Sequence, residues 1–130
     1  MTITALLAIM AMQTFPAPAG PGWHQVGGDA AGSYAVYSES VRRSGDDVTA
    51  VVRIDVTRGA RTGRRIIGVI RYVYHCAAGT YRMEAGDLYD ADGTYMAPAP
   101  LTAEHHGDRP VPENTPTSGV RDYLCRGQAQ

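Results

Sequence analysis

The stretch VTAVVRIDV, residues 48–56, is the clearest strand of the sequence. Every second residue from Val48 to Val56 is apolar, and the residues between them are mixed: Thr49, Val51, Arg53 and Asp55. A strict period of two indicates a strand with one buried face and one partly wet face. A second stretch, IIGVIRYVYHC at residues 66–76, follows after a basic, glycine-containing loop. Cys76 shares the parity of Ile70, Tyr72 and Tyr74, so its side chain is expected on their side of the sheet.

Shorter segments on both sides of these strands have β patterns as well. We expect strands at residues 23–27, 33–37, 80–90 and 94–97, with turns at 44–47 and 90–93. In the segment 80–90, alternation places one set of side chains on a common face: Tyr81, Met83, Ala85 and Tyr89. Gly93 suits the positive φ of a hairpin turn, and Pro98 and Pro100 end the last strand.

The C-terminal third lacks β patterns. Residues 102–116 are polar and proline-rich, so we expect a loop there. Thr117 or Ser118 can then cap a short helix that ends at Arg126. The resulting fold class is α+β: an antiparallel meander of about six strands, with a C-terminal helix on one face of the sheet.

Cys76 and Cys125 are the two cysteines of the chain. An even count in a short chain with a secretion-like leader fits one disulfide in an exported domain. The bridge would fasten the terminal helix to the sheet, and closing so long a loop is worth about 4 kcal/mol in the chain-entropy model. The alternative is two free thiols in a cytosolic protein.

The N-terminus resembles a signal peptide over residues 1–19, with the domain at residues 20–130. Residues 3–12 form an apolar run that is too short to cross a bilayer, and Ala17-Pro18-Ala19 is an A-x-A cleavage site. No Arg or Lys precedes the run, so a buried N-terminal helix is the alternative. No cysteine lies near the cleavage site. We therefore expect a periplasmic or secreted protein without a stable membrane anchor.

Composition excludes some partners. The chain of 130 residues is 44% hydrophobic and 19% charged, with a net charge of -1. It can bury the core of one domain. Without a basic excess, neither nucleic acid nor an anionic membrane surface is expected as a partner.

The order of several short motifs resembles the surface-adhesin protein E family of exported bacterial proteins. The motifs, which cover nearly all of the expected mature chain, are WHQV at 23–26, YAVYSESVRR at 34–43, SGDDVT at 44–49, YVYHC at 72–76, YR at 81–82, YDADG at 89–93, VP at 111–112 and VRDYLC at 120–125. The resemblance implies a sheet of about six strands whose concave side holds a disulfide-tethered helix. It also implies adhesion to host matrix and plasma proteins, with homodimer formation.

No catalytic constellation is found, so the chain is not predicted to be an enzyme, and no cofactor or metal is predicted. His105-His106 with Asp108 is the best metal candidate, but neighbouring histidines rarely share one ion. Asp90-x-Asp92-Gly93 resembles the start of a calcium loop without its later ligands, so a hairpin turn is favoured.

Two groups of residues are candidates for partner binding. Arg58, Arg61, Arg64 and Arg65 form the densest cationic cluster, which suits an acidic protein or an anionic glycan; the alternative is a solvated hairpin. Tyr72 and Tyr74 could line a binding face, or could complete the sheet under the helix. The predicted function is an exported binding domain. Its alternative is a periplasmic domain that holds a small apolar ligand or an envelope partner between helix and sheet.

Overall fold

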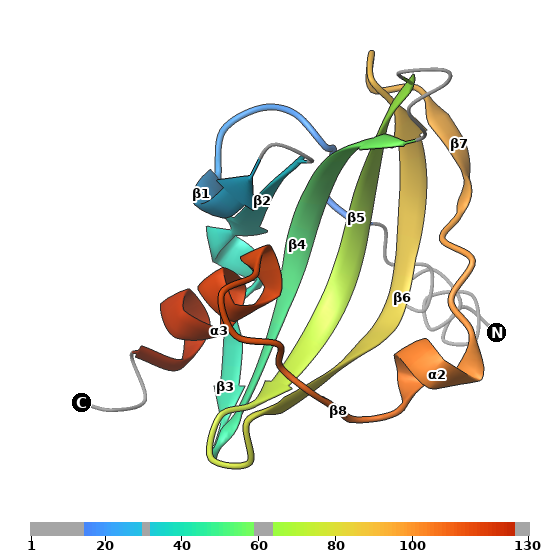
Figure 1. Cartoon of the computed structure of the whole chain (residues 1–130). Helices are drawn as coiled ribbons and strands as arrows, with labels where there is room; N and C mark the ends of the chain where they lie inside the picture. Colours follow the sequence, from blue (N-terminus) through green and yellow to red (C-terminus); the bar gives the residue numbers. More distant parts are fainter. Residues whose placement is uncertain (1–14, 30–31, 59–63, 127–130) are drawn as a thin grey trace, which may run out of the picture.

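A computed structural model of the chain describes residues 15–29, 32–58 and 64–126 (Figure 1). Its centre is an antiparallel sheet whose main path runs in chain order, β1-β2-β4-β5-β6-β7. The bounds of these strands are Trp23–Asp29, Gly32–Tyr37, Asp47–Arg58, Arg64–His75, Thr80–Asp90 and Tyr95–Pro98. The two longest, β4 and β5, pair from Asp47↔His75 to Arg58↔Arg64. The predicted meander is therefore confirmed.

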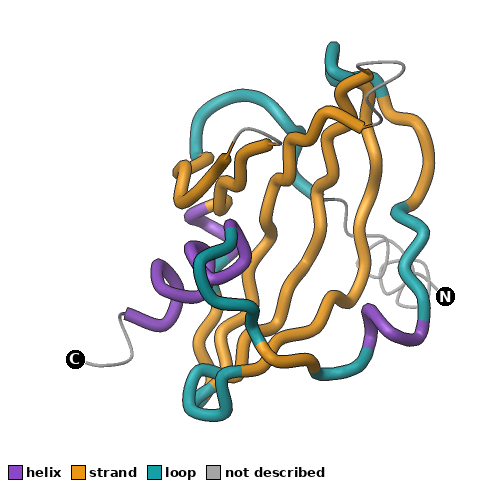
Figure 2. The backbone as a smooth tube through the Cα atoms, viewed as in Figure 1, coloured by secondary structure: helices purple, strands orange, loops and turns teal. Residues whose placement is uncertain are grey.

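The sheet curls into a half-barrel, and the helix α3 (Pro116–Arg126) lies across its inner side (Figures 1 and 2). We call this inner side the helix face and the outer side the back face. The helix face carries the main core. Its fully buried side chains come from β2, β4, β5 and α3: Val36, Val48, Ala50, Val52, Tyr72, Tyr74, Val120 and Leu124. Val48, Ala50 and Val52 thus belong to the helix-face core, as the pattern of a strand with one buried face predicts.

Short elements complete the chain. After β2, the 3-10 turn η1 (Ser38–Ser40) leads into β3 (Arg42–Ser44), which forms a hairpin with β4. The prediction of an unbroken loop over residues 102–116 is wrong at two places, α2 (Ala103–His106) and β8 (Arg109–Pro110). β8 pairs with the start of β6. A two-residue strand that pairs with a distant partner leaves no periodic signal in the sequence.

A β-bulge in β6 overturns one predicted face. The register of β5 and β6 shifts between Arg71 and Tyr72, which pair with Ala85 and Met83. The extra residue reverses the alternation. Tyr81 and Met83 therefore belong to the helix-face core, whereas Tyr89 packs on the back face. The sequence pattern had placed all of them on one side, because alternation alone cannot reveal an inserted residue.

The back face is more apolar than the pattern predicts. Val51, Ile67 and Val69 form a second buried cluster there, and the chain's N-terminal segment contributes to covering it: Phe15 and Trp23 pack against the cluster, together with Tyr37 and Tyr89. In Figure 1 the described segment that precedes β1 passes behind β4 and β5. The face predicted to be mixed therefore has an apolar centre.

The terminal helix begins two or three residues earlier than the predicted caps, Thr117 or Ser118, would place it. Its first residue is Pro116, a favoured first position, and the Thr115 hydroxyl accepts a hydrogen bond from the Ser118 amide (3.2 Å). Thr115 is thus the capping residue instead of Thr117 or Ser118. The helix also approaches β1 closely at Gly119, where an added Cβ would lie 2.9 Å from the Val26 carbonyl oxygen.

Candidate functional site

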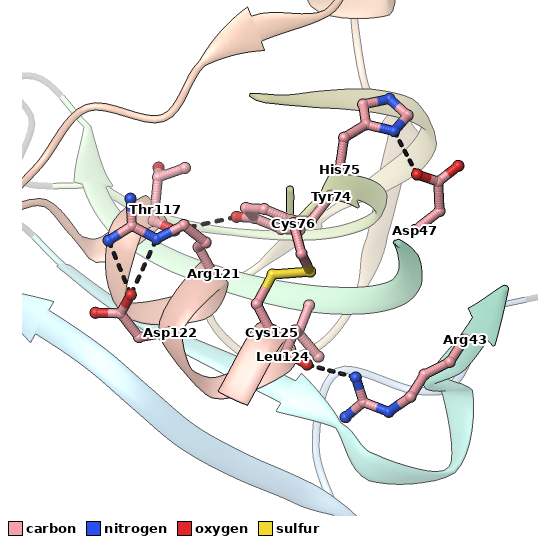
Figure 3. Close-up of a disulfide and its surroundings, with 10 residues drawn as sticks. All are labelled: Arg43, Asp47, Tyr74, His75, Cys76, Thr117, Arg121, Asp122, Leu124 and Cys125. Atoms are coloured by element: carbon pink, nitrogen blue, oxygen red, sulfur yellow. Dashed lines mark hydrogen bonds and ion pairs between the residues drawn. A yellow bond between two sulfur atoms is a disulfide. The ribbon is translucent and has the colours of Figure 1, made fainter. Parts of the chain in front are cut away.

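The predicted disulfide between Cys76 and Cys125 is present, with 5.6 Å between the Cα atoms (Figure 3). It joins the end of β5 to the last turn of α3. A second tie, not foreseen from the sequence, supports the same end of the helix: the Arg43 guanidinium donates a hydrogen bond to the Leu124 carbonyl oxygen (2.6 Å). A cation at a helix C-terminus also interacts favourably with the helix dipole.

The tyrosines predicted as a binding face lie in the core. Tyr72 and Tyr74 are 1% and 0% exposed, and both stack with Tyr81 at ring-centroid distances of 6.0 and 5.7 Å. The Tyr74 hydroxyl donates to the Thr117 carbonyl oxygen (3.2 Å) and so holds α3. Burial raises the pKa of both phenols well above the usual value. In the folded domain these two tyrosines therefore expose no surface to a partner. They complete the sheet under the helix, which is the alternative interpretation of the sequence.

The same packing concerns the alternative prediction, a small apolar ligand held between helix and sheet. Tyr72 and Tyr74 from the sheet meet Val120 and Leu124 from α3, and all four side chains are 1% exposed or less. Protein atoms thus occupy the space where such a ligand would sit. The Tyr72 hydroxyl is buried and has no hydrogen-bond partner within the described part of the chain.

The arginine cluster lies at the connection of β4 and β5. Arg58 and Arg64 are paired across the ladder, so the two strands form the predicted hairpin. The Arg65 side chain is 54% exposed and forms an ion pair with Asp55. Arg61, and the side chains of Arg58 and Arg64, lie outside what the structure describes. The role of these arginines in partner binding stays a prediction.

A charged cluster surrounds His75 at the opposite end of the same strands. The Nδ1 atom of His75 lies 2.7 Å from an Asp47 carboxylate oxygen, and its Nε2 atom lies 3.0 Å from Asp108. The hydrogen bond to Asp47 is the main cause of a raised pKa of His75; Asp108 adds to it and desolvation opposes it. Arg82 also lies 3.0 Å from Nε2. A neutral His75 can accept from Arg82, and a protonated His75 donates to Asp108 instead.

The structure does not bring His105, His106 and Asp108, the predicted metal candidate, together at one site. His105 Nδ1 accepts from the Thr102 amide, and His106 lies 3.1 Å from the Met83 carbonyl oxygen. The Asp108 carboxylate contacts His75 instead of His105 or His106. No group of three or more His, Cys, Asp or Glu residues within the described ranges could hold a metal ion. At Asp90–Gly93 the chain makes the expected hairpin turn, in which Gly93 has a φ of 91° and donates to the Asp90 carbonyl.

An open pocket of about 340 Å³ lies on the back face, beside the N-terminal segment. It could not be predicted from the sequence, because its wall comes from four separate segments. Its lining residues are Phe15, Pro16, Tyr37, Glu39, Ser40, Arg42, Thr49, Val51 and Arg71. The lining combines the aromatic rings of Phe15 and Tyr37 with the charged side chains of Glu39, Arg42 and Arg71.

The fold defines a small domain with a curled antiparallel sheet and a helix tethered to it by a disulfide. A family model described as surface-adhesin protein E matches residues 23–126, from the first strand to the last residue of α3. The chain belongs to this family, as the motifs predicted. Membership in this family indicates an adhesin-like protein that is exported or displayed at the surface, with a non-enzymatic role. No match was found among curated proteins or solved structures. Among the described residues, no helix is long and apolar enough to cross a membrane.

Proposed function

We propose that this chain is an exported binding domain that recognises an extracellular or envelope protein, or an anionic glycan, through its exposed surface. The observation that carries this proposal is the family match, which spans the whole sheet, the disulfide and α3. A disulfide is typical of oxidising compartments, so it supports a periplasmic or secreted location. The proposal includes removal of residues 1–19, with Gly20 as the mature N-terminus.

The arginine hairpin is the contact that we propose for an anionic partner. Arg65 is exposed, and the pairing of Arg58 with Arg64 brings the cluster to the turn between two long strands. The register of β4 and β5 puts Arg58 and Arg64 at one end of the two strands and His75 at the other. Several charges gathered in one loop steer an anionic partner, and their effect weakens as salt screens them.

The test measures binding of the exported protein to immobilised heparin and extracellular matrix proteins at low and high salt. Arg64→Ser/Arg65→Ser should weaken binding and reduce its salt dependence. A surface ion pair is worth about 1 kcal/mol or less, so the melting temperature should move only slightly although Arg65 loses its partner Asp55. Arg126→Ser removes one positive charge elsewhere and serves as the control, matched to the single variant Arg65→Ser. Equal loss in both single variants, or salt-insensitive binding, would contradict the assignment to the hairpin.

Processing is tested separately. N-terminal sequencing of the protein recovered from the envelope or the medium should begin at Gly20. Recovery of the chain from the cytoplasm with Met1 retained would contradict export, whatever the outcome of the binding assays.

A further inference from the structure

The back face already holds a peptide, namely the chain's own segment before β1. Three contacts fix this segment to the sheet. The Arg71 guanidinium lies 5.0 Å from the centre of the Phe15 ring. The Ala17 carbonyl oxygen accepts from the Trp23 indole N–H (3.0 Å), and the Pro18 carbonyl oxygen accepts from the Arg53 guanidinium (2.8 Å). Pro18 is buried by the contact.

The chemistry of this segment explains how it binds. Pro16 and Pro18 lock their own φ angles and disfavour the helical region for Phe15 and Ala17, so the sequence Phe-Pro-Ala-Pro is held extended before it binds. Neither proline has an amide hydrogen, and the segment offers carbonyl oxygens and apolar rings. These are the features by which extended proline-rich peptides are recognised in aromatic grooves.

The receiving surface is arranged to match. The Trp23 ring lies 5.1 Å from the Tyr37 ring and 5.2 Å from the guanidinium of Arg53. The platform is thereby held in place, and two side-chain N–H donors are directed at the peptide. We call this surface the Trp23 groove. The pocket of about 340 Å³ adjoins Phe15 and Pro16, so the groove continues beyond the segment that occupies it.

Cleavage before Gly20 would remove this occupant. Residues 15–19 precede the expected mature N-terminus, whereas Trp23, Arg53 and Arg71 remain with the sheet. The mature chain would keep every strand and α3, because β1 begins at Trp23. It would also lose part of the cover over the cluster of Val51, Ile67 and Val69, against which Phe15 packs. An uncovered apolar cluster beside fixed polar donors is typical of a binding site.

We propose that the Trp23 groove of the mature protein binds an extended segment of a partner protein with the pattern aromatic-Pro-x-Pro. The aromatic ring would take the place of Phe15 under Arg71, and the prolines would take those of Pro16 and Pro18. The inference rests on the proposed export, since it needs residues 15–19 to be removed. It is independent of the arginine hairpin, which lies at the end of the sheet.

The test uses the processed protein, purified after export and with its N-terminus determined by mass spectrometry. The probe is the capped peptide FPAPAG, which repeats residues 15–20. Trp23 is the only tryptophan of the chain, so its fluorescence reports directly on the groove. A saturable change in emission is expected. The peptides FAAAAG and APAPAG should bind more weakly, because the first lacks the prolines and the second lacks the ring.

Variants assign the site. Arg53→Met keeps the aliphatic stem and removes the donor to the Pro18 carbonyl, so affinity should fall by about tenfold, as expected for a hydrogen bond from a charged group. Arg71→Met should weaken FPAPAG more than APAPAG, since it removes the partner of the ring. Arg126→Met, on the far end of α3, should change nothing. Near-ultraviolet circular dichroism and the melting temperature show whether each variant is folded.

Three outcomes would overturn the proposal. They are an exported protein that retains residues 15–19, the absence of a saturable signal with FPAPAG, and equal binding of all three peptides. Heparin or matrix binding that depends on Arg64 and Arg65 would survive any of these results. The failure of the groove is therefore distinguishable from the failure of the adhesin-like function.

Discussion

Tyr72 and Tyr74 differ by one hydrogen bond, and this makes them a matched pair for a stability measurement. Both rings are buried on the helix face, and both stack with Tyr81. The Tyr74 hydroxyl donates to the Thr117 carbonyl oxygen, whereas the Tyr72 hydroxyl has no partner among the described residues. Changing each to Phe removes only the hydroxyl and keeps the ring.

Only one of the two substitutions is expected to destabilise the protein. Tyr74→Phe loses a hydrogen bond at 3.2 Å and leaves the Thr117 carbonyl without this donor, which should cost about 1 kcal/mol in the free energy of unfolding. Tyr72→Phe removes a buried polar group that gains nothing in return. Burying an unpaired hydroxyl costs about 1–3 kcal/mol, so this variant should be neutral or more stable than the wild type.

Urea unfolding of the oxidised protein, followed by circular dichroism, measures both variants against the wild type. At about 4–8 °C of melting temperature for each kcal/mol, the two should be clearly separated in a thermal scan too. A Tyr72→Phe variant that is destabilised as much as Tyr74→Phe would refute the reasoning. The Tyr72 hydroxyl would then have a partner, such as a buried water shared with the Nε atom of Arg109, which is also unpaired in the described part of the chain.

Three further predictions concern the helix and the His75 cluster. Cys125→Ala should lower the free energy of unfolding by about 2–5 kcal/mol, measured by urea unfolding, and hydrogen exchange of α3 should rise; unchanged exchange would show that the bridge is not what holds the helix. Gly119→Ala should destabilise the protein, because the added Cβ would lie 2.9 Å from the Val26 carbonyl oxygen. This effect opposes the higher helix propensity of Ala, which is about 1 kcal/mol better than Gly. A variant that is more stable than the wild type in a thermal scan would contradict the close approach. Folding raises the pKa of His75 through Asp47, so its stabilising effect is fully present below the unfolded value of about 6.5 and is lost as pH rises through the folded pKa. The destabilisation by His75→Gln should thus be larger at low than at high pH, and an NMR titration midpoint for His75 at or below the unfolded value would contradict the assignment.

Local pattern was sufficient for much of the fold. The alternation at residues 48–56 and 66–76 predicted β4 and β5, because a strand buried on one face must repeat every two residues. The shared parity of Tyr72, Tyr74 and Cys76 placed the disulfide on the helix face. The bulge in β6 could not be predicted from alternation. A register shift is a relation between two strands, and neither strand shows it alone.

The candidate sites were less predictable than the fold. Tyr72 and Tyr74 have the same residue type and spacing as a binding face, and only the docking of α3 over them decides that they are buried. The His75 cluster joins residues from β4, β5, β6 and the segment before β8. Contacts of this kind depend on which strands lie side by side, so spacing along the chain carries no trace of them.

The sequence by itself determined the antiparallel meander, the terminal helix and the family, because each depends on local periodicity or on the order of short motifs. It also determined the disulfide, because the chain is short, has two cysteines and begins with a secretion-like leader. Only the tertiary structure decided which tyrosines are buried, where Asp47 and Asp108 meet His75, and that residues 15–18 contact Trp23, Arg53 and Arg71 on the back face. The physical reason is the same in each case. Burial and side-chain pairing are set by surfaces that meet across long separations, whereas a strand or a helix is set mainly by its own residues.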